Sequence, residues 1–363
     1  MKQIVTDRRA LHRIPELDRA LDQTLAYLSA ALKPLDCRIF SPIPGALCAY
    51  FDRGAAATLA FRSDADALPV QEETHLPFAS EHAGKMHACG HDGHMAMLLE
   101  LARRLHGRPA EHNFLLIFQP AEETTGGARD ICESGVLEDH RVEAIFGMHL
   151  WPGLERGRVA SRANEMMSRS CEVTVEITGR SSHIARADEG RDALMAGVDF
   201  LCRAREIERS YPPEVFRLLR FGHMQSGSVR NAISAHSRIE GSLRAFQDEI
   251  FDSMLNGVKA ACEALERETL CRFQLTTSQG YPAVMNPPEL YQRVRRCGLA
   301  FDELPKPMMI TEDFSWYQRW RPGMFFLLGV GDAPALHASN FDFDEDVLET
   351  GADFWEQLAL TYR

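Results

Sequence analysis

The sequence has no apolar run long enough to cross a membrane, and none near its start that resembles the core of a signal peptide. The first residues, MKQIVTDRRALHRIPEL, mix apolar and charged side chains instead. A spanning helix needs about 20 consecutive apolar residues and a signal peptide about 7–15. We therefore expect a soluble, cytoplasmic protein that is not exported by this route.

An excess of basic residues is also lacking. The chain carries 40 Lys and Arg against 52 Asp and Glu, which gives a formal net charge of −12. Nucleic acids and anionic membrane surfaces attract positive charge, so this balance argues against non-specific binding to either. We expect neither as a partner.

A regular cysteine pattern is the third absence. The nine cysteines are odd in number and scattered through 363 residues, which indicates reduced thiols rather than a disulfide framework. No internal repeat or low-complexity tract is visible either. Because single cores usually stop growing above roughly 250–300 residues, this length predicts two domains.

Short apolar runs alternate with helical patterns through the first half of the chain. The runs predict buried strands at 46–51, 57–62, 113–119 and 143–148. Helical periodicity covers 7–33, 92–107 and 125–137. Alternation of this kind predicts an α/β fold with a mostly parallel sheet.

The pattern changes near residue 168, where CEVTVEITG alternates apolar and polar side chains. The order of elements up to residue 277 is βαββαβ, which predicts a small antiparallel sheet with two helices on one face. The buried-strand pattern returns in MFFLLGVG at 324–331. We therefore expect one domain from 1–167 and 278–363, with an α+β domain inserted at 168–277.

Polar residues with metal-binding groups follow or flank the predicted strands of the larger domain. They are Asp64, Asp66, Cys89, His91, Glu122, Glu123, His149 and His337. In open α/β sheets ligands bind beyond the carboxyl ends of the strands, so these side chains should converge. Carboxylates, imidazoles and a thiol that meet at one point predict a metal centre.

The spacing of these residues suits that chemistry. Cys89 and His91 are two residues apart, so in extended chain they point to the same side. Glu122 and Glu123 are adjacent and should point different ways, so one can bind a metal while the other acts as a general base. Asp92 is expected to cap the following helix.

Each of these features also has a simpler interpretation. Adjacent glutamates are often a solvated turn, and a single histidine such as His149 or His337 is often a hydrogen-bonded core residue. Cys89 could instead be the nucleophile of a Cys–His hydrolase, but that reading leaves Glu122 and Glu123 without a role.

The motifs resemble those of the M20 family of metallopeptidases and amidohydrolases. The matching stretches are LHRIPEL, FRSDADALPVQEE, LPFASE, MHACGHDGHMAMLLELARRL, IFQPAEETTGGA, FGMHLWP, TEDFSWYQ, PGMFFLLGVG and LHASNFDFDEDVL. They run in the family's order over nearly the whole chain. Within the family, the chain looks most like hippurate hydrolases, N-acyl-amino-acid deacetylases and auxin-conjugate hydrolases.

The resemblance implies a site with two divalent metal ions. The ligands it implies are Cys89, His91, Glu123, His149 and His337. Cys89 would bridge the ions, Glu122 would be the general base and acid, and Asp66 would orient a ligand. Manganese is favoured by the resemblance, while the thiolate and imidazoles also suit zinc.

The resemblance also gives the inserted domain a role as a lid that often mediates homodimerisation. His183 resembles the lid histidine that stabilises the oxyanion, sometimes from the partner subunit. Asn231 and Arg244 resemble lid positions that hold the substrate, and Arg244 suits a carboxylate. A plain solvated strand face is the alternative for Arg244.

The departures from the family fall in the lid. Ser181 and Ser182 stand where two glycines are common before His183, and no second histidine follows. The Asn-Val-Ile-Pro pattern is replaced by Asn-Ala-Ile-Ser from Asn231 to Ser234. These changes put the substrate preference in doubt and leave the metal motifs untouched.

The expected function is therefore metal-dependent hydrolysis of the amide bond of an N-acyl amino acid, such as an N-acetyl or N-benzoyl derivative. A dipeptidase or carboxypeptidase with the same centre is the first alternative. A non-catalytic metal-binding protein that recognises small ligands is the second. The presence of Glu122 and of all five implied ligands argues against the second.

Overall fold

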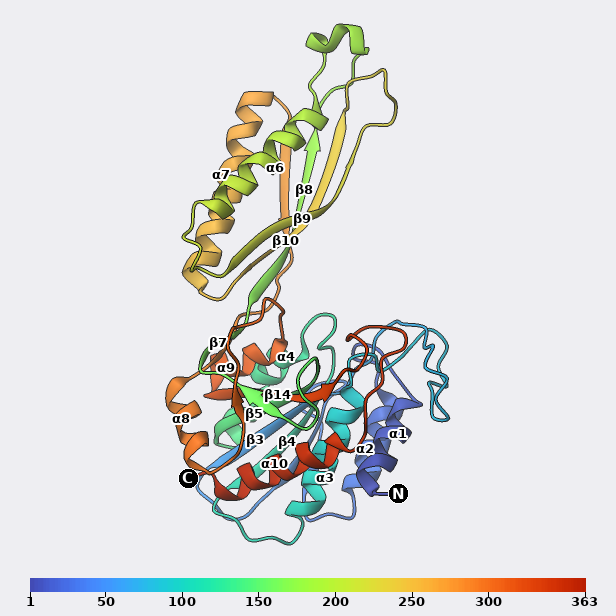
Figure 1. Ribbon diagram of the computed structural model, residues 1–363, viewed down its shortest axis with the longest axis vertical. Helices are drawn as coiled ribbons and strands as arrows, with labels where there is room; N and C mark the ends of the chain where they lie inside the picture. Colours follow the sequence, from blue (N-terminus) through green and yellow to red (C-terminus); the bar gives the residue numbers. More distant parts are fainter. The chain divides into compact units, whose positions relative to one another are not determined.

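The computed structural model describes residues 1–363, which form two compact units. Unit 1 comprises Met1–Met166, Met285–Pro307 and Glu312–Arg363, and unit 2 comprises Met167–Val284 and Met308–Thr311. Figure 1 draws both units, coloured along the chain. Unit 2 is thus an insertion into unit 1 along the sequence, with a short second segment at 308–311.

Two stretches that we expected in the larger domain belong to unit 2. The amide of Ser170 donates to the carbonyl of Tyr281 at 3.2 Å, and the amide of Ser168 donates to that of Ile310 at 2.8 Å. These backbone bonds join 278–284 and 308–311 to the start of unit 2. The inserted unit therefore extends beyond the expected end at residue 277.

Unit 1 is built on an eight-stranded sheet in the order β1-β2-β4-β3-β5-β14-β6-β13. Its central strands β4, β3, β5 and β14 pair in parallel, whereas β1–β2, β2–β4 and β14–β6 are antiparallel. The strands of this sheet are β1 (Arg38–Phe40), β2 (Leu47–Phe51), β3 (Thr58–Asp64), β4 (Asn113–Gln119), β5 (Val142–Pro152), β6 (Val159–Ser161), β13 (Asp302–Glu303) and β14 (Gly323–Gly331). The predicted α/β fold with a mostly parallel sheet is confirmed.

Helices cover both faces of this sheet. Successive residues of a strand point to opposite faces. In β14, Phe326 packs against Phe354 and Phe325 against Phe314. The helices of unit 1 are α1 (Gln3–His12), α2 (Asp22–Leu32), α3 (His91–Leu105), α4 (Gly127–Glu133), α5 (Val136–Asp139), α8 (Pro288–Arg296), η2 (Asp313–Trp316), α9 (Tyr317–Trp320) and α10 (Val347–Thr361). Burial on both faces explains why the strands read as continuous apolar runs.

Three predicted elements of unit 1 differ in detail. The stretch 7–33 is not one helix but α1 and α2, because Pro15 and the left-handed Asp18 (φ 56°) lie between them. The stretch 125–137 divides into α4 and α5 at Gly135, where φ is 81°. β5 continues to Pro152 because it pairs with β14, so His149 lies within the strand rather than after it.

Unit 2 contains a four-stranded antiparallel sheet in the order β11-β8-β10-β9. Its elements are β8 (Arg169–Thr178), η1 (Ile184–Glu189), α6 (Ala193–Arg209), β9 (Arg217–Ser226), β10 (His236–Ala245), α7 (Asp248–Thr269) and β11 (Arg272–Thr277). α6 and α7 lie on one face of the sheet and share its core (Figure 1). The predicted βαββαβ order is confirmed.

Two short strands, β7 (Asn164–Met167) and β12 (Val284–Asn286), lie where the chain passes from one unit to the other. None of the helices in either unit is long and apolar enough to cross a membrane.

Candidate metal centre

Cys89 and His91 lie at the start of α3, on either side of Gly90. Gly90 is the N-cap of the helix and has a φ of 87°, a conformation that a residue with a Cβ rarely adopts. A Cβ there would also come within 3.1 Å of the side chain of Leu150. The glycine therefore allows the chain to turn so that Cys89 and His91, both almost fully buried, stand beside each other.

Asp92 is not the expected N-cap, because it lies one residue inside α3. Its carboxylate is buried and accepts hydrogen bonds from Arg8 Nε and His12 Nδ1, both at 2.8 Å. Burial lowers the pKa of His12, but Asp92 and Glu72 outweigh it and raise that pKa to about 9. Asp92 thus anchors α3 to α1, which carries Arg8 and His12.

Glu122 and Glu123 follow β4, and Asp66 fixes both of them. Ala121 turns the chain with a φ of 60°, which is strained for a residue other than glycine. The amides of Glu122 and Glu123 then donate to Asp66 Oδ1 and Oδ2 at 3.0 and 3.1 Å. The backbone carbonyl of Asp66 accepts from His91 Nδ1 at 2.8 Å. Asp66 therefore orients a predicted ligand through its carbonyl oxygen and both glutamates through its carboxylate.

The predicted ligands come together in two groups that share Cys89. One group is Cys89, His91 and His149, and the other is Cys89, Glu123 and His337. Within each group the ligand atoms lie within 4.8 Å of one another. Cys89 Sγ is 3.4 Å from His149 Nε2, and His337 Nε2 is 3.3 Å from Glu123 Oε1. All five predicted ligands thus belong to one continuous cluster.

The hydrogen bonds of the imidazoles suit metal binding. His91 and His149 each use Nδ1 to donate to a backbone carbonyl, that of Asp66 and that of Leu150. The Nε2 of His91 is buried and has no hydrogen-bond partner. A buried nitrogen without a partner is costly unless a cation accepts its lone pair. The residues present therefore fit a site for two divalent ions, in which Cys89 would belong to both groups of donors.

Burial has opposite consequences for metal binding by Cys89 and by His149. Burial, together with the charges of Glu123 and Glu122, raises the pKa of Cys89 well above its usual range. Burial lowers the pKa of His149 to about 3. Ligands must be deprotonated to bind a metal, so His149 is ready to bind whereas Cys89 would lose its proton as an ion enters.

Glu122 lies beside the ligands, in a group with His91 and Glu123. Burial, followed by the charges of Glu312 and Glu123, raises the pKa of Glu122 well above its usual range. A raised pKa brings a carboxyl group nearer to neutrality, where it can both take and give a proton.

Sequence reasoning missed a second layer of buried charges. Arg62 Nη1 lies 2.9 Å from Asp64 Oδ2, and His94 Nδ1 lies 2.6 Å from Asp64 Oδ1. Asp64 Oδ2 is also 3.7 Å from His91 Nε2. Asp64 was recognised as a strand-end carboxylate, but the FRSD motif did not indicate that Arg62 would be buried with it.

The predicted lid residues all lie in unit 2. The amide of Ile184 donates to the carbonyl of Asn231 at 3.0 Å, so His183 and Asn231 are neighbours, and both are exposed. Arg244 is not with them. Arg244 pairs with Ser170 near the start of β8, whereas Thr178, the last residue of β8, leads into the loop that carries His183. The eight residues from Ser170 to Thr178 correspond to about 26 Å of strand.

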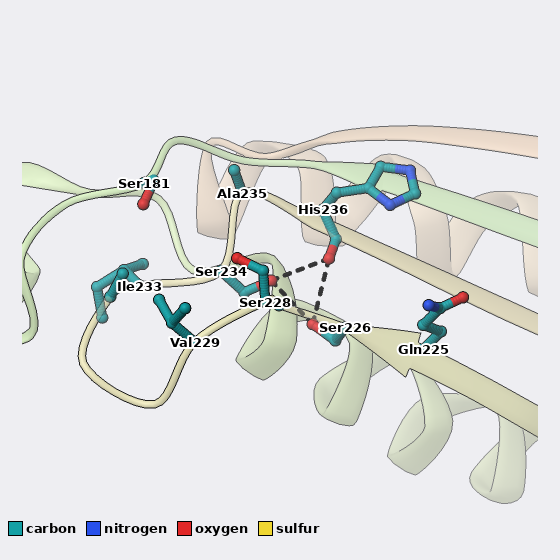
Figure 2. A pocket seen from close by; sticks show the side chains of 11 residues that line it. Ser181, Gln225, Ser226, Ser228, Val229, Ile233, Ser234, Ala235 and His236 are labelled. Atoms are coloured by element: carbon teal, nitrogen blue, oxygen red, sulfur yellow. Dashed lines mark hydrogen bonds between the residues drawn. The ribbon is translucent and has the colours of Figure 1, made fainter.

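A cavity of about 370 Å³ lies in the same part of unit 2 as His183. Its lining includes Ser181 and Ser234, two of the residues that depart from the family pattern. Figure 2 shows the hydroxyls of Ser226 and Ser234 directed towards the backbone oxygen of His236, whose ring points away from them. Two of the departures from the family pattern, at Ser181 and Ser234, therefore line the same cavity.

The comparisons with known proteins cover nearly the whole chain. The sequence model of peptidase family M20/M25/M40 matches residues 60–361. An uncharacterized hydrolase from Staphylococcus haemolyticus is 32% identical over 378 residues, which covers 99% of this chain and 98% of that protein.

Two solved structures are also similar. One is a proposed aminohydrolase from methicillin-resistant Staphylococcus aureus, with a TM-score of 0.91, 29% identity, and coverage of 99% of this chain and 96% of that one. The other is a dinuclear metal-binding M20 peptidase from Bacillus subtilis, with a TM-score of 0.85, 27% identity, and coverage of 99% and 97%.

Proposed function

Because this chain belongs to peptidase family M20/M25/M40, we propose that it is a metal-dependent amidohydrolase that cleaves the amide bond of N-acyl amino acids. One observation carries the proposal. Glu122, a buried carboxyl group, stands beside two groups of metal-binding side chains that share Cys89. This arrangement supports a role for Glu122 as the general base beside the donors of a two-metal site.

The residues divide the reaction between them. Two divalent ions held by Cys89 and its neighbours would polarise the amide carbonyl and make a water molecule more acidic. Glu122 would take a proton from the attacking water and deliver it to the leaving nitrogen as the C–N bond breaks. Asp66 holds the amide of Glu122 and thereby keeps the base in place.

His183 has the form required of an oxyanion donor. Its Nδ1 accepts a hydrogen bond from the amide of Ala185 at 3.2 Å, so a neutral ring carries its proton on Nε2. That N–H is directed away from the local backbone contact and can donate to a developing negative charge. In this proposal Asn231 and Arg244 bind the substrate, with Arg244 facing a carboxylate. Because the two residues lie at opposite ends of the sheet of unit 2, one substrate meets both only when they come from two subunits of a homodimer.

The types of ligand side chain influence which metal ion the site would bind. A thiolate and three imidazoles favour zinc, whereas the carboxylate and the resemblance to the M20 family favour manganese. We propose manganese, with zinc as the alternative. A homodimer through unit 2 is also part of the proposal, supported by exposed apolar side chains on α6 at Leu194, Met195 and Val198.

A hydrolysis screen tests the substrate class. The purified protein, with manganese or zinc added, is given N-acetyl amino acids, N-benzoyl amino acids and unmodified dipeptides. Release of the free amino acid from the N-acyl compounds is the expected result. Cleavage of dipeptides alone would replace the proposal with a dipeptidase, and no cleavage of any substrate would contradict both.

A further inference from the structure

Glu312 is a buried carboxyl group that the reaction above does not use. It precedes η2 in the stretch TEDFSW, and only 3% of the residue is exposed. Its charged neighbours include Arg62 of β3 and the adjacent Asp313. One carboxyl oxygen of Glu312, one of Glu122 and one of Asp313 all lie within 4.8 Å of one another.

Two donors around Glu312 reach the same one of its two oxygens. Arg62 Nη2 lies 3.0 Å from Glu312 Oε1, and the amide of Phe314 donates to the same oxygen at 3.0 Å. Both fixed donors therefore reach Oε1. The arrangement leaves Oε2 for a contact of another kind.

Asp313 cannot serve Glu122, because its own oxygens are already bound. Asp313 accepts from Gln119 Nε2 at 2.7 and 2.9 Å, from Arg62 Nη2 at 2.6 Å and from the amide of Ala128 at 3.0 Å. These donors fix Asp313 to β3, β4 and α4. Of the two acidic residues in this stretch, Glu312 is therefore the one whose second oxygen can form a hydrogen bond with Glu122.

The charge around Arg62 does not balance. This one guanidinium faces Asp64, Glu312 and Asp313, and all four side chains are buried. His94 also faces Asp64 at 2.6 Å, which leaves Glu312 and Asp313 to share Arg62, and two buried carboxylates beside one cation are unfavourable, so one of them is best neutral. Burial, with the charges of Asp313 and Asp64, raises the pKa of Glu312 to about 8. This shift favours the protonated form of Glu312.

We propose that Glu312 is a positioning residue that holds the side chain of Glu122 through a carboxyl–carboxylate hydrogen bond. The inference rests on the proposed function of Glu122 and adds the partner that orients it. Arg62 and the amide of Phe314 fix Oε1, so the proton of Glu312 lies on Oε2 and points to Glu122. Glu122 is then held at both ends, its amide by Asp66 and its carboxylate by Glu312.

Substitutions at Glu312 test this role. Glu312→Gln keeps the shape and an N–H donor, so kcat should stay within about threefold of the wild type. Glu312→Ala removes the donor, so kcat should fall by roughly 10–100-fold while KM and bound metal stay unchanged. An equal loss in both variants, or wild-type kcat in Glu312→Ala, would overturn the proposal.

A double-mutant cycle separates positioning from stability. Glu312→Ala should cost nothing further in a Glu122→Gln background if it acts through Glu122. The control is Glu16→Ala, because Glu16 is also a buried carboxylate but binds only the amides of Gln23 and Thr24. It should lower the melting temperature and leave kcat unchanged. Additive losses in the cycle would show a merely structural role for Glu312.

Crystal structures of the metal-loaded wild type, Glu312→Gln and Glu312→Ala decide the question without any substrate. The Glu122 carboxylate should keep one conformation in the first two and move or become disordered in the third. If no N-acyl amino acid is cleaved, the proposed function fails on its own. An unmoved Glu122 in Glu312→Ala would refute the positioning role independently.

Discussion

The candidate site residues of unit 1 and those of unit 2 are held in opposite ways. Cys89, His91 and Glu122 are buried, and backbone hydrogen bonds fix His91 and Glu122 on strand ends and at a helix start. His183 and Asn231 are exposed on neighbouring loops. Water can form hydrogen bonds with exposed polar groups, whereas a buried polar atom such as His91 Nε2 needs a partner within the protein or a bound ion.

This difference indicates which candidate residues are held in position before a substrate binds. Fixed, buried donors define the metal positions without help from a ligand, which is the form of preorganisation that catalysis needs. Exposed loop residues acquire fixed positions only through further contacts. Variants of the predicted ligands in unit 1 should therefore alter metal content, whereas variants in unit 2 should alter activity alone.

Glu122→Gln should show the largest effect. Gln keeps the volume and the backbone contact with Asp66 but cannot accept a proton, so activity should fall by about 10³-fold or more. Elemental analysis should find the same metal content as in the wild type. Activity close to that of the wild type would remove Glu122 from the role of base.

Cys89→Ala should separate metal binding from folding. Because Cys89 belongs to both ligand groups, its loss should reduce bound metal from about two ions per chain to one or none. Cys48→Ala is the matched control, since Cys48 is another buried free cysteine with no place in the cluster. Equal metal content in Cys89→Ala and the wild type would exclude Cys89 as a ligand.

His183→Ala tests the role of the exposed candidate residues of unit 2. Loss of one oxyanion donor should lower kcat by about 10²-fold, with bound metal and melting temperature unchanged. His223→Ala, an exposed histidine of the same unit that binds Glu240, should have no effect. Mixing Glu122→Gln with His183→Ala protomers should partly restore activity if His183 acts on a partner subunit, and no recovery would favour action within one chain.

The smallest expected effect concerns pH and the stability of unit 1. His12 has a pKa raised from 6.5 to about 9 by Asp92 and Glu72, against the effect of burial. A raised pKa stabilises the fold fully below about pH 6.5, and this contribution disappears as the pH rises through about 9. Denaturation at pH 6 and pH 9 should show this loss in the wild type and a smaller one in His12→Gln. An equal pH dependence in both would contradict it.

Local patterns were enough to predict the strands and the family. The strand at 113–119 has the predicted bounds, because an apolar run follows directly from burial on two faces. The M20 family named from the motifs is confirmed, and its specific branch stays a prediction. The roles of the individual site residues also stay predictions, although the five ligands lie together.

Long-range partners could not be predicted in the same way. Arg62 and Glu312 lie 250 positions apart in the sequence, and only the register of β3 and the return of the chain to unit 1 bring them together. The same holds for Asp92, which local rules read as a helix cap and which instead binds Arg8. Each of these contacts joins residues that are far apart in the sequence, so a short stretch of sequence cannot predict it.

The position of His337 has a consequence for how the centre is made in a growing chain. Four of the five predicted ligands precede unit 2 in the sequence, and His337 follows it. At about 5–20 residues per second, roughly 10–40 s of synthesis separate His149 from His337. With these five residues as ligands, the set would stay incomplete during that interval until His337 is added. Metal supply during translation, as well as the affinity of the finished site, should therefore influence which ion this protein carries.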